Sequence, residues 1–383
     1  MEGGMFMRFI QVEGAHKDMG VSQGEEVRER LPKFLKATIE SDLWKAVKPK
    51  FLPNWLIFSL GGVYARGMLK RYLQRFPHQY ERIKGIAQGA EVSPNLIFAI
   101  HASEAIGGDT KQHFEIPGCT SLIFSSEATK DKKIILGKNY DIYYNLQDFQ
   151  IVRVSKPKGR YSSLCLTQDF LAGNHNGVNE CGLVIIYTYA YPWEDYSLEG
   201  VPITILIQEA LETCKDTKEA ISFFEKTIRS NGANLGLADD KGNVCVLETS
   251  KSKIKIRKPE NGRLIHTNHY LHSEMIPLDT PNDAVHKLNH PQVKGKNAKL
   301  SSLLRYKRAE ELAKANTGNL TEEILMNIFR DHGEENDPSD NTICRHAELW
   351  GTLSSVIFYP QRRALKVVEG NPCQGEYKMY ELK

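Results

Sequence analysis

The sequence predicts an α+β protein in which two stacked β-sheets are flanked by helices. The first third of the chain has helical periodicity, the part after residue 118 is rich in short β-type runs, and two helical segments interrupt those runs. Runs of strands with grouped helices between them are typical of layered sheets. With 383 residues and 41% hydrophobic content, the chain can bury a large core.

The helical first third consists of three periodic segments and one capped segment. The periodic segments are His16 to Leu43, Trp55 to Phe76 and Tyr80 to Gly89. Ser93 and Pro94 then provide an N-cap and a first-turn proline for a fourth helix. Phe51 to Leu69 is apolar, but polar residues, glycine and proline interrupt it, so we expect a buried helical hairpin or a cap over a substrate site rather than a membrane span.

The second part alternates strands with two helices. The predicted strands include Ile134 to Leu136, Gln150 to Val154, Leu183 to Tyr189 and Leu235 to Leu237. Each predicted helix, Ile203 to Cys214 and Thr217 to Arg229, has one apolar stripe, and Asp216 or Thr217 caps the second. Thr352 to Tyr359 and Ala364 to Glu369 predict a late hairpin, and Asp279 to Lys299 predicts a long loop.

Charge and cysteine content exclude several function classes. The formal net charge of +3 is too small to imply a nucleic-acid partner. The first residues lack the pattern of a secretory signal, so we expect a cytoplasmic protein. The seven cysteines form no CxxC pair and show no histidine at zinc-ligand spacing, so neither a metal site nor a disulfide framework is expected. No phosphate-binding glycine motif suggests a nucleotide or flavin cofactor, and we expect none.

Cys119 differs from the other cysteines in its context. Cys165 and Cys245 lie inside apolar runs and are expected to be core residues. Cys119 instead begins an apolar run after Gly118, and a polar turn and a second run lead to Lys138 and Asp141. This pattern predicts a β-hairpin that returns a cation and a carboxylate toward the thiol.

Five stretches of the sequence form a recognisable set in this order. They are Gly118-Cys119-Thr120-Ser121, Gly137-Lys138-Asn139-Tyr140-Asp141, Gly177-Val178-Asn179-Glu180-Cys181-Gly182-Leu183, His266-Thr267-Asn268-His269 and Ser301-Ser302-Leu303-Leu304-Arg305-Tyr306-Lys307-Arg308. Together they resemble the acyl-coenzyme A:isopenicillin N acyltransferase family of N-terminal nucleophile hydrolases, which includes peptidase family C45. The helical first third, including Gly85 to Ala90, also resembles the family's pro-region.

The resemblance implies a four-layer αββα sandwich and a zymogen that cleaves itself between Gly118 and Cys119. Residues 1–118 would be a helical pro-region, which stays bound as a second subunit, and residues 119–383 the catalytic domain. The thiol would attack the Gly118 carbonyl, and water would hydrolyse the resulting thioester. The freed α-amino group, with a reference pKa of about 7.7 to 8.0, would then serve as the base.

The resemblance also implies roles for individual residues. Asp141 would orient the α-amino group, Arg305 would assist it, and Asn268 would donate to the oxyanion. Lys138 stands where the related bile salt hydrolases carry arginine, and no asparagine follows Leu183 as it does in them, so a backbone N–H or another arrangement completes the oxyanion hole. The expected substrate-binding residues are Thr120, Lys138, Tyr140, Tyr187 and Tyr189, the last two in an aromatic cluster with Tyr191, Trp193 and Tyr196.

The expected substrate is a small acyl amide or a thioester, with coenzyme A thioesters included, and both hydrolysis and acyl transfer remain open. No integral membrane segment is expected.

Two other functions are also consistent with the residues. One is a binding protein of the same fold that lost processing. The other is a Cys-His protease, for which His175, His266 and His269 are the available bases.

Overall fold

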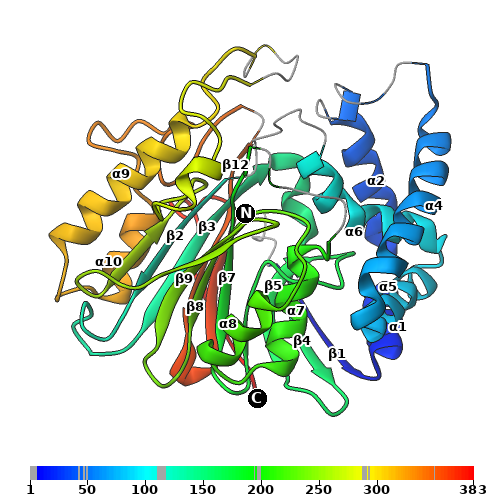
Figure 1. Ribbon diagram of the computed structural model, residues 1–383, viewed down its shortest axis with the longest axis horizontal. Helices are drawn as coiled ribbons and strands as arrows, with labels where there is room; N and C mark the ends of the chain where they lie inside the picture. The colour runs from blue at the N-terminus through cyan, green and yellow to red at the C-terminus, as the bar shows by residue number, and fades with distance from the viewer. Residues whose placement is uncertain are drawn as a thin grey trace, which may run out of the picture.

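Two β-sheets stack face to face with helices outside each of them (Figure 1). The computed structural model describes residues 7–41, 44–45, 48, 51–109, 118–193, 195, 200–286, 291, 294–348 and 350–383. Leu43 and Tyr196 lie outside these residues. The layered α+β sandwich predicted from the sequence is confirmed.

Sheet A contains eight strands among the described residues, in the order β1-β4-β5-β6-β7-β8-β9-β10. All neighbours pair antiparallel except β1, which pairs in parallel with β4. The strands are β1 (Arg8–Gly14), β4 (Gln150–Pro157), β5 (Ser163–Gln168), β6 (Asn176–Asn179), β7 (Val184–Tyr189), β8 (Ala233–Ala238), β9 (Val244–Thr249) and β10 (Ile254–Arg257).

Sheet B contains six antiparallel strands in the described part of the chain, in the order β11-β2-β3-β12-β13-β14. The predicted hairpins β2–β3 and β12–β13 are confirmed, whereas β14 was not expected. The strands are β2 (Gly118–Phe124), β3 (Ile135–Tyr143), β11 (Arg263–His266), β12 (Trp350–Tyr359), β13 (Ala364–Glu369) and β14 (Lys378–Glu381).

Three apolar clusters separate the four layers. Ile123 and Val356 of sheet B meet Val152 and Val184 of sheet A in the central cluster. Outside sheet B, α9 (Leu300–Ala315) and α10 (Glu322–Phe329) cover one cluster. Outside sheet A, α7 (Ile203–Thr213) and α8 (Thr217–Glu225) cover the other, together with helices from the first third of the chain. The expected core cysteines Cys165 and Cys245 are buried.

The first third is mostly helical, as predicted, but its helices are divided differently. They are α1 (His16–Val27), α2 (Leu31–Glu40), α4 (Asn54–Tyr72), α5 (Pro77–Gly89) and α6 (Pro94–Asp109). A 3-10 turn at Arg28–Arg30 separates α1 from α2, so the single periodic segment contains two helices. Strand β1 was not expected, and it makes this part of the chain continuous with sheet A. The second helix after β7, α8, ends at Glu225 rather than at Arg229.

Helices α1 and α5 approach each other closely because both carry glycine at the contact. A Cβ added at Gly20 would lie 2.2 Å from the Arg82 carbonyl oxygen, and one at Gly85 would lie 2.2 Å from the Lys17 carbonyl oxygen. Neither position can accept a side chain without moving a helix backbone.

The apolar stretch from Phe51 to Leu69 is not a buried hairpin. Most of it lies in one helix, α4, whose outer face exposes Trp55, Leu60, Val63 and Tyr64. The expected hairpin is therefore wrong, because the interrupting glycines are tolerated inside a continuous helix. Among the described residues, no helix combines the length and the hydropathy that crossing a bilayer requires.

Candidate active site

Cys119 is the second residue of β2, in the middle of the molecule. In the β2–β3 register, Gly118 faces Asp141, Cys119 faces Tyr140, and Ser121 faces Lys138. The predicted return of Lys138 and Asp141 to the start of β2 is therefore confirmed. The whole of β2 is buried, and Cys119, Lys138 and Asp141 are each fully inaccessible to solvent.

Strand alternation divides the site between the two faces of sheet B. Cys119 and Lys138 share their face with Ile123 and Leu136, which pack against sheet A. The Lys138 ammonium donates to the Tyr187 carbonyl, lies 4.9 Å from the centre of the Tyr140 ring and is close enough to the Cys119 thiol for each group to shift the pKa of the other. Burial raises the pKa of the Cys119 thiol, and the Lys138 charge opposes that rise.

Asp141 and Arg305 lie on the opposite face of β2 and β3, beneath α9. The Arg305 guanidinium donates to the Cys119 carbonyl at 2.7 Å and to the Thr120 hydroxyl at 2.9 Å. One Asp141 oxygen accepts from Thr352 at 2.8 Å, while the other, Oδ2, is buried without a hydrogen bond and lies 3.8 Å from Arg305. An unsatisfied buried carboxylate oxygen is costly, so its position needs a functional explanation.

Asn268 connects the two faces through the backbone of Cys119. Its Oδ1 accepts from the Cys119 N–H at 3.1 Å and from Arg305 at 2.8 Å. Its Nδ2 donates to the Tyr189 carbonyl at 3.0 Å. The Tyr189 backbone opposes the rise in the pKa of the Cys119 thiol, so this backbone lies beside the thiol. All four expected catalytic residues, Cys119, Asp141, Asn268 and Arg305, thus lie together.

Arg345 is a site residue that the sequence reasoning missed. Its Nη1 lies 3.6 Å from Asp141 Oδ2, and its Nη2 pairs with Asp340 at 2.5 Å. A Cβ added at Gly118 would lie 2.1 Å from the same Nη1 and 3.0 Å from Asp141 Oδ2. Gly118 therefore leaves the space in which Arg345 and Asp141 meet. No local motif marks Arg345, because it lies in a loop more than 200 residues after Asp141.

The expected substrate-binding tyrosines occupy different environments. Tyr140 and Tyr189 surround Cys119 in an apolar cluster with Ile142 and Leu353. Tyr187 is fully buried in the cluster between sheet A and its helices, and its ring stacks on His175. Tyr140 and Tyr189 thus border the Cys119 side chain.

The three histidines considered as protease bases have other partners. His175 packs between Tyr140 and Tyr187, and burial lowers its pKa to about 3. His266 binds Glu248 at 3.0 Å. His269 binds Ser302 at 2.8 Å, and burial lowers its pKa to about 3. These contacts do not favour the Cys-His protease alternative.

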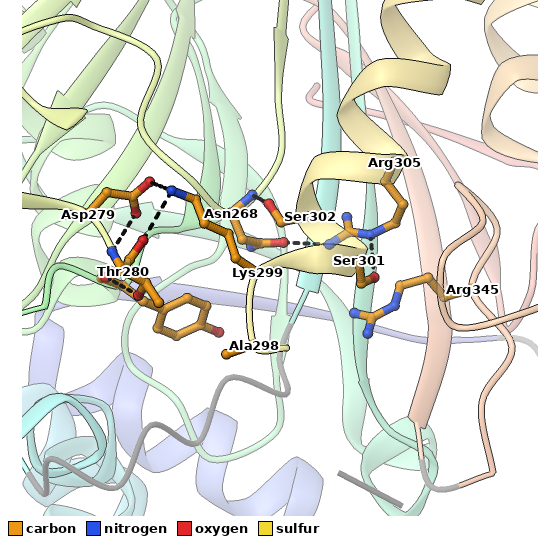
Figure 2. Close-up of a pocket in the computed structure, with 10 residues that line it drawn as sticks. Asn268, Asp279, Thr280, Ala298, Lys299, Ser301, Ser302, Arg305 and Arg345 are labelled. Carbon is orange, nitrogen blue, oxygen red and sulfur yellow. Dashed lines mark hydrogen bonds and ion pairs between the residues drawn. The ribbon is translucent and has the colours of Figure 1, made fainter. Parts of the chain in front are cut away.

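A small polar recess adjoins the site. Figure 2 shows Asn268, Arg305 and Arg345 on one side of it and Lys299 with Asp279 on the other. Lys299 pairs with Asp279 at 2.5 Å and donates to the Thr280 carbonyl at 3.1 Å. The predicted long loop from Asp279 to Lys299 therefore contributes one wall of this recess.

Two groups of side chains among the described residues could hold a metal ion. One contains His16, His78 and Glu212, and the other contains His332, Cys344, His346 and Cys373. In the second group, Cys344 Sγ lies 3.4 Å from His346 Nε2. The spacing of the cysteines in the sequence did not indicate this group, because folding brings Cys373 to the other three from a separate loop.

Two solved structures resemble the fold, each with a TM-score of 0.43 and 69% coverage of this chain. One is a mutant of the conjugated bile acid hydrolase from Clostridium perfringens, at 15% identity and 97% coverage of that chain. The other is the Caenorhabditis elegans orthologue of N-acylethanolamine-hydrolyzing acid amidase, at 17% identity and 100% coverage.

In sequence, the chain is 26% identical over 308 residues to the 40 kDa form of the acyl-coenzyme A:6-aminopenicillanic-acid-acyltransferase of Emericella nidulans. This match covers 78% of the chain and 77% of that protein. The sequence model of the acyl-coenzyme A:6-aminopenicillanic acid acyl-transferase family matches residues 128–374, which is more than half of the chain and begins after Cys119. The chain therefore belongs to this acyl-transferase family.

Proposed function

We propose that this protein is a self-processing enzyme that cleaves or transfers an acyl group through a thioester on Cys119. The observation that carries the proposal is the set of contacts around the Gly118–Cys119 bond. Asn268 holds the amide nitrogen of Cys119, Arg305 holds its carbonyl, and an oxygen of Asp141 that accepts no hydrogen bond lies beside Gly118. Packing alone does not account for this concentration of buried polar groups around one peptide bond.

Processing begins when the Cys119 sulfur attacks the carbonyl carbon of Gly118. The C–N bond breaks, the nitrogen takes the thiol proton, and a thioester joins Gly118 to the sulfur. Water then hydrolyses the thioester, which releases the Gly118 carboxylate and restores the thiol. The leader, residues 1–118, and the body, residues 119–383, are thereafter separate chains.

After the cut, the α-amino group of Cys119 becomes the base for its own thiol. Asn268 Oδ1 already accepts from this nitrogen, and Asp141 Oδ2 provides a negative charge next to the space that Gly118 leaves. With a reference pKa of about 7.7 to 8.0, such an amine can take up a proton near neutral pH. Arg305 acts as a positioning residue, since it binds the Cys119 carbonyl and Asn268.

Two donors are candidates for the oxyanion hole. The first is Asn268, whose amide nitrogen is oriented by its bond to the Tyr189 carbonyl. The second is the backbone N–H of Tyr189, which lies beside the Cys119 thiol and would take the place of the missing asparagine side chain. One such donor typically changes kcat by about 10² to 10³. Lys138 acts at an earlier step than either donor, when the nucleophile forms, because its positive charge favours the ionised thiolate of Cys119.

We propose a small acyl amide or an acyl thioester as the substrate, in keeping with the acyltransferase relative from Emericella nidulans. Tyr140, Tyr189 and Ile142 would contact the acyl chain, and the polar recess next to Asn268 would receive the other half of the substrate. Coenzyme A fits this scheme as part of a co-substrate.

The test is the mass of the purified protein beside its Cys119→Ala variant. We expect two fragments from the unaltered chain, one of them beginning at Cys119, and a single uncut chain from the variant. If both proteins remain uncut, Cys119 has no free amine and the proposed function is wrong. If both are cut at the same place, another protease makes the cut.

A further inference from the structure

Four potential metal ligands meet near Arg345, and two of them are its neighbours in the chain. We call them the S2N2 cluster, which consists of His332, Cys344, His346 and Cys373. They come from two loops: His332, Cys344 and His346 lie in the long loop between α10 and β12, and Cys373 lies in the loop between β13 and β14. One ligand atom from each lies within 4.8 Å of the ligand atoms of the other three.

We propose that the S2N2 cluster binds one Zn²⁺ ion. Two cysteines and two histidines are a common tetrahedral ligand set for zinc, and thiolate with imidazole favours zinc over hard cations. Zn–S and Zn–N bonds of about 2.3 and 2.0–2.1 Å place the sulfur and nitrogen ligands of a tetrahedral ion about 3.6 Å apart. His346 Nε2 lies 3.4 Å from Cys344 Sγ and 3.5 Å from Cys373 Sγ.

His332 has the orientation of a ligand rather than of a hydrogen-bonded core histidine. Its Nδ1 binds Asn336 Oδ1 at 3.3 Å, which leaves Nε2 as the nitrogen with a free lone pair. That Nε2 is buried and has no hydrogen-bond partner. A ligand histidine commonly donates its other ring nitrogen to such an oxygen, which fixes the ring and the tautomer. The rings of His332 and His346 meet edge to face, 5.1 Å apart.

The charges of the site also suit zinc. Binding removes one proton from each thiol, and the two thiolates then neutralise the two charges of the ion while both imidazoles stay neutral. Cys344 is fully buried, so a neutral complex avoids leaving a charge in the interior.

The second group of possible ligands does not carry the same inference. His16 binds Glu212 at 2.8 Å, and His78 binds Glu209 at 2.6 Å. Gln79 and Gln208 also donate to Glu212. These contacts already occupy the ligand atoms, so no ion is needed to explain why the side chains meet.

Zinc at the S2N2 cluster would fix the segment that carries Arg345. Cys344 and His346 are the two neighbours of Arg345 in the chain, and Arg345 reaches Asp141 and the space beside Gly118. The ion would thus join the α10–β12 loop, which carries Arg345, to the β13–β14 loop. This consequence rests on the proposed function, whereas zinc binding itself does not.

The experiment measures zinc in protein without an affinity tag, made in zinc-supplemented medium and carrying Cys119→Ala so that processing plays no part. We expect about one zinc per chain, a loss of most of it in Cys373→Ser, and full zinc content in the control Cys181→Ser. Cys181 is half-buried like Cys373 but lies outside the cluster. If Cys373→Ser does not fold, His332→Gln serves in its place.

A second measurement adds Co²⁺ to the metal-free protein. We expect a thiolate-to-cobalt absorption band that Zn²⁺ abolishes and that the ligand variant lacks. Equal zinc in the parent and the ligand variant would overturn the proposal, as would zinc-free protein with no cobalt band. A Cys344–Cys373 disulfide in the freshly purified chain, detected by peptide mass under non-reducing conditions, would also overturn it.

Discussion

Two regions of contact join the proposed leader, residues 1–118, to the body, residues 119–383, and they differ in the kind of contact they contain. At the Gly118–Cys119 bond, the contacts are polar and buried, and they surround one peptide bond. Elsewhere, β1 pairs with β4 over seven residues, helices of the leader share an apolar cluster with α7 and α8, and single polar contacts are spread along the interface. Among these polar contacts, Glu104 accepts from the Thr204 hydroxyl at 2.6 Å and His101 accepts from the Ala172 N–H at 2.8 Å.

The difference indicates that the contacts around the Gly118–Cys119 bond, the first junction, serve the cleavage reaction. The contacts of β1 and the leader helices with the body, the second junction, hold the two parts together. Breaking the first removes a single covalent bond, whereas the second continues a sheet and a core. We therefore expect the cut leader to remain bound. Substitutions at the first junction should change processing and leave the leader attached. Substitutions at the second junction should weaken the attachment of the leader and leave processing unchanged.

Asp141→Asn should have the largest effect. It removes the charge that would hold the α-amino group and leaves Arg305 and Arg345 without a buried anion. We expect processing and turnover to fall by about 100-fold or more. The control is Asp148→Asn, which breaks an exposed ion pair with Lys33 across the second junction. It should leave processing unchanged and cost less than about 1 kcal/mol. Equal rates in both variants would contradict the role of Asp141.

Gly118→Ala should slow processing by about 10-fold, a barrier increase of about 1.4 kcal/mol. The added Cβ meets the Arg345 guanidinium, which must leave Asp141 to make room. A time course of fragment formation on a gel measures the rate. The matched control is Gly67→Ala in α4, where no heavy atom lies within 4 Å of the added Cβ. Unchanged cleavage in Gly118→Ala would mean that the contact of Arg345 with Asp141 is not needed for the cut.

Lys138→Met should shift the reactivity of Cys119 to higher pH. The Lys138 charge opposes the rise in the thiol pKa that burial causes, so its loss raises that pKa further. Near neutral pH, we expect about a 10-fold slower alkylation of Cys119, which is the effect of a one-unit change in pKa. The measurement is the pH profile of iodoacetamide labelling at Cys119. A profile that stays in place would show that Lys138 does not control the thiol.

His101→Gln should have the smallest effect, and only in acid. Burial lowers the pKa of His101 to about 4, against about 6.5 when unfolded, so the unfolded chain binds a proton first as the pH falls. Stability is thus lost between pH 6.5 and 4, by up to about 1.4 kcal/mol per pH unit.

Denaturant titrations of the two chains, both carrying Cys119→Ala, measure this loss. The variant should lose less stability on acidification than its parent, and the two curves should run in parallel above pH 7. Comparing the two chains is necessary because Glu104, whose pKa burial raises to about 7, acts in the opposite direction in the same range. Identical acid dependence in both chains would show that His101 does not link the second junction to pH.

The sequence predicts the first junction better than the second. The β2–β3 hairpin follows from apolar runs separated by a polar turn, and its register is what brings Lys138 and Asp141 to Cys119. Strand β1 could not be foreseen in the same way, because a short edge strand that pairs in parallel with a distant strand has no turn signal beside it.

Arg345 and the S2N2 cluster escape sequence reasoning for a related reason. His332 and Cys373 are separated by 40 intervening residues and lie in different loops, so only the packing of β12 and β13 brings them together. Cys344 and His346 are close in sequence, but their spacing alone did not suggest a four-ligand site. A local pattern predicts groups on one hairpin, and it does not predict groups that meet from two separate loops.

The most direct test of the account labels the purified enzyme with a slowly turned-over acyl thioester and locates the acyl group by peptide mass spectrometry. We predict a modified peptide whose first residue is Cys119, with the acyl group on its sulfur and a free α-amino group that sequencing identifies. An acyl group found on any other residue, or on a Cys119 still joined to Gly118, would contradict the proposal that cleavage creates the nucleophile and its base together.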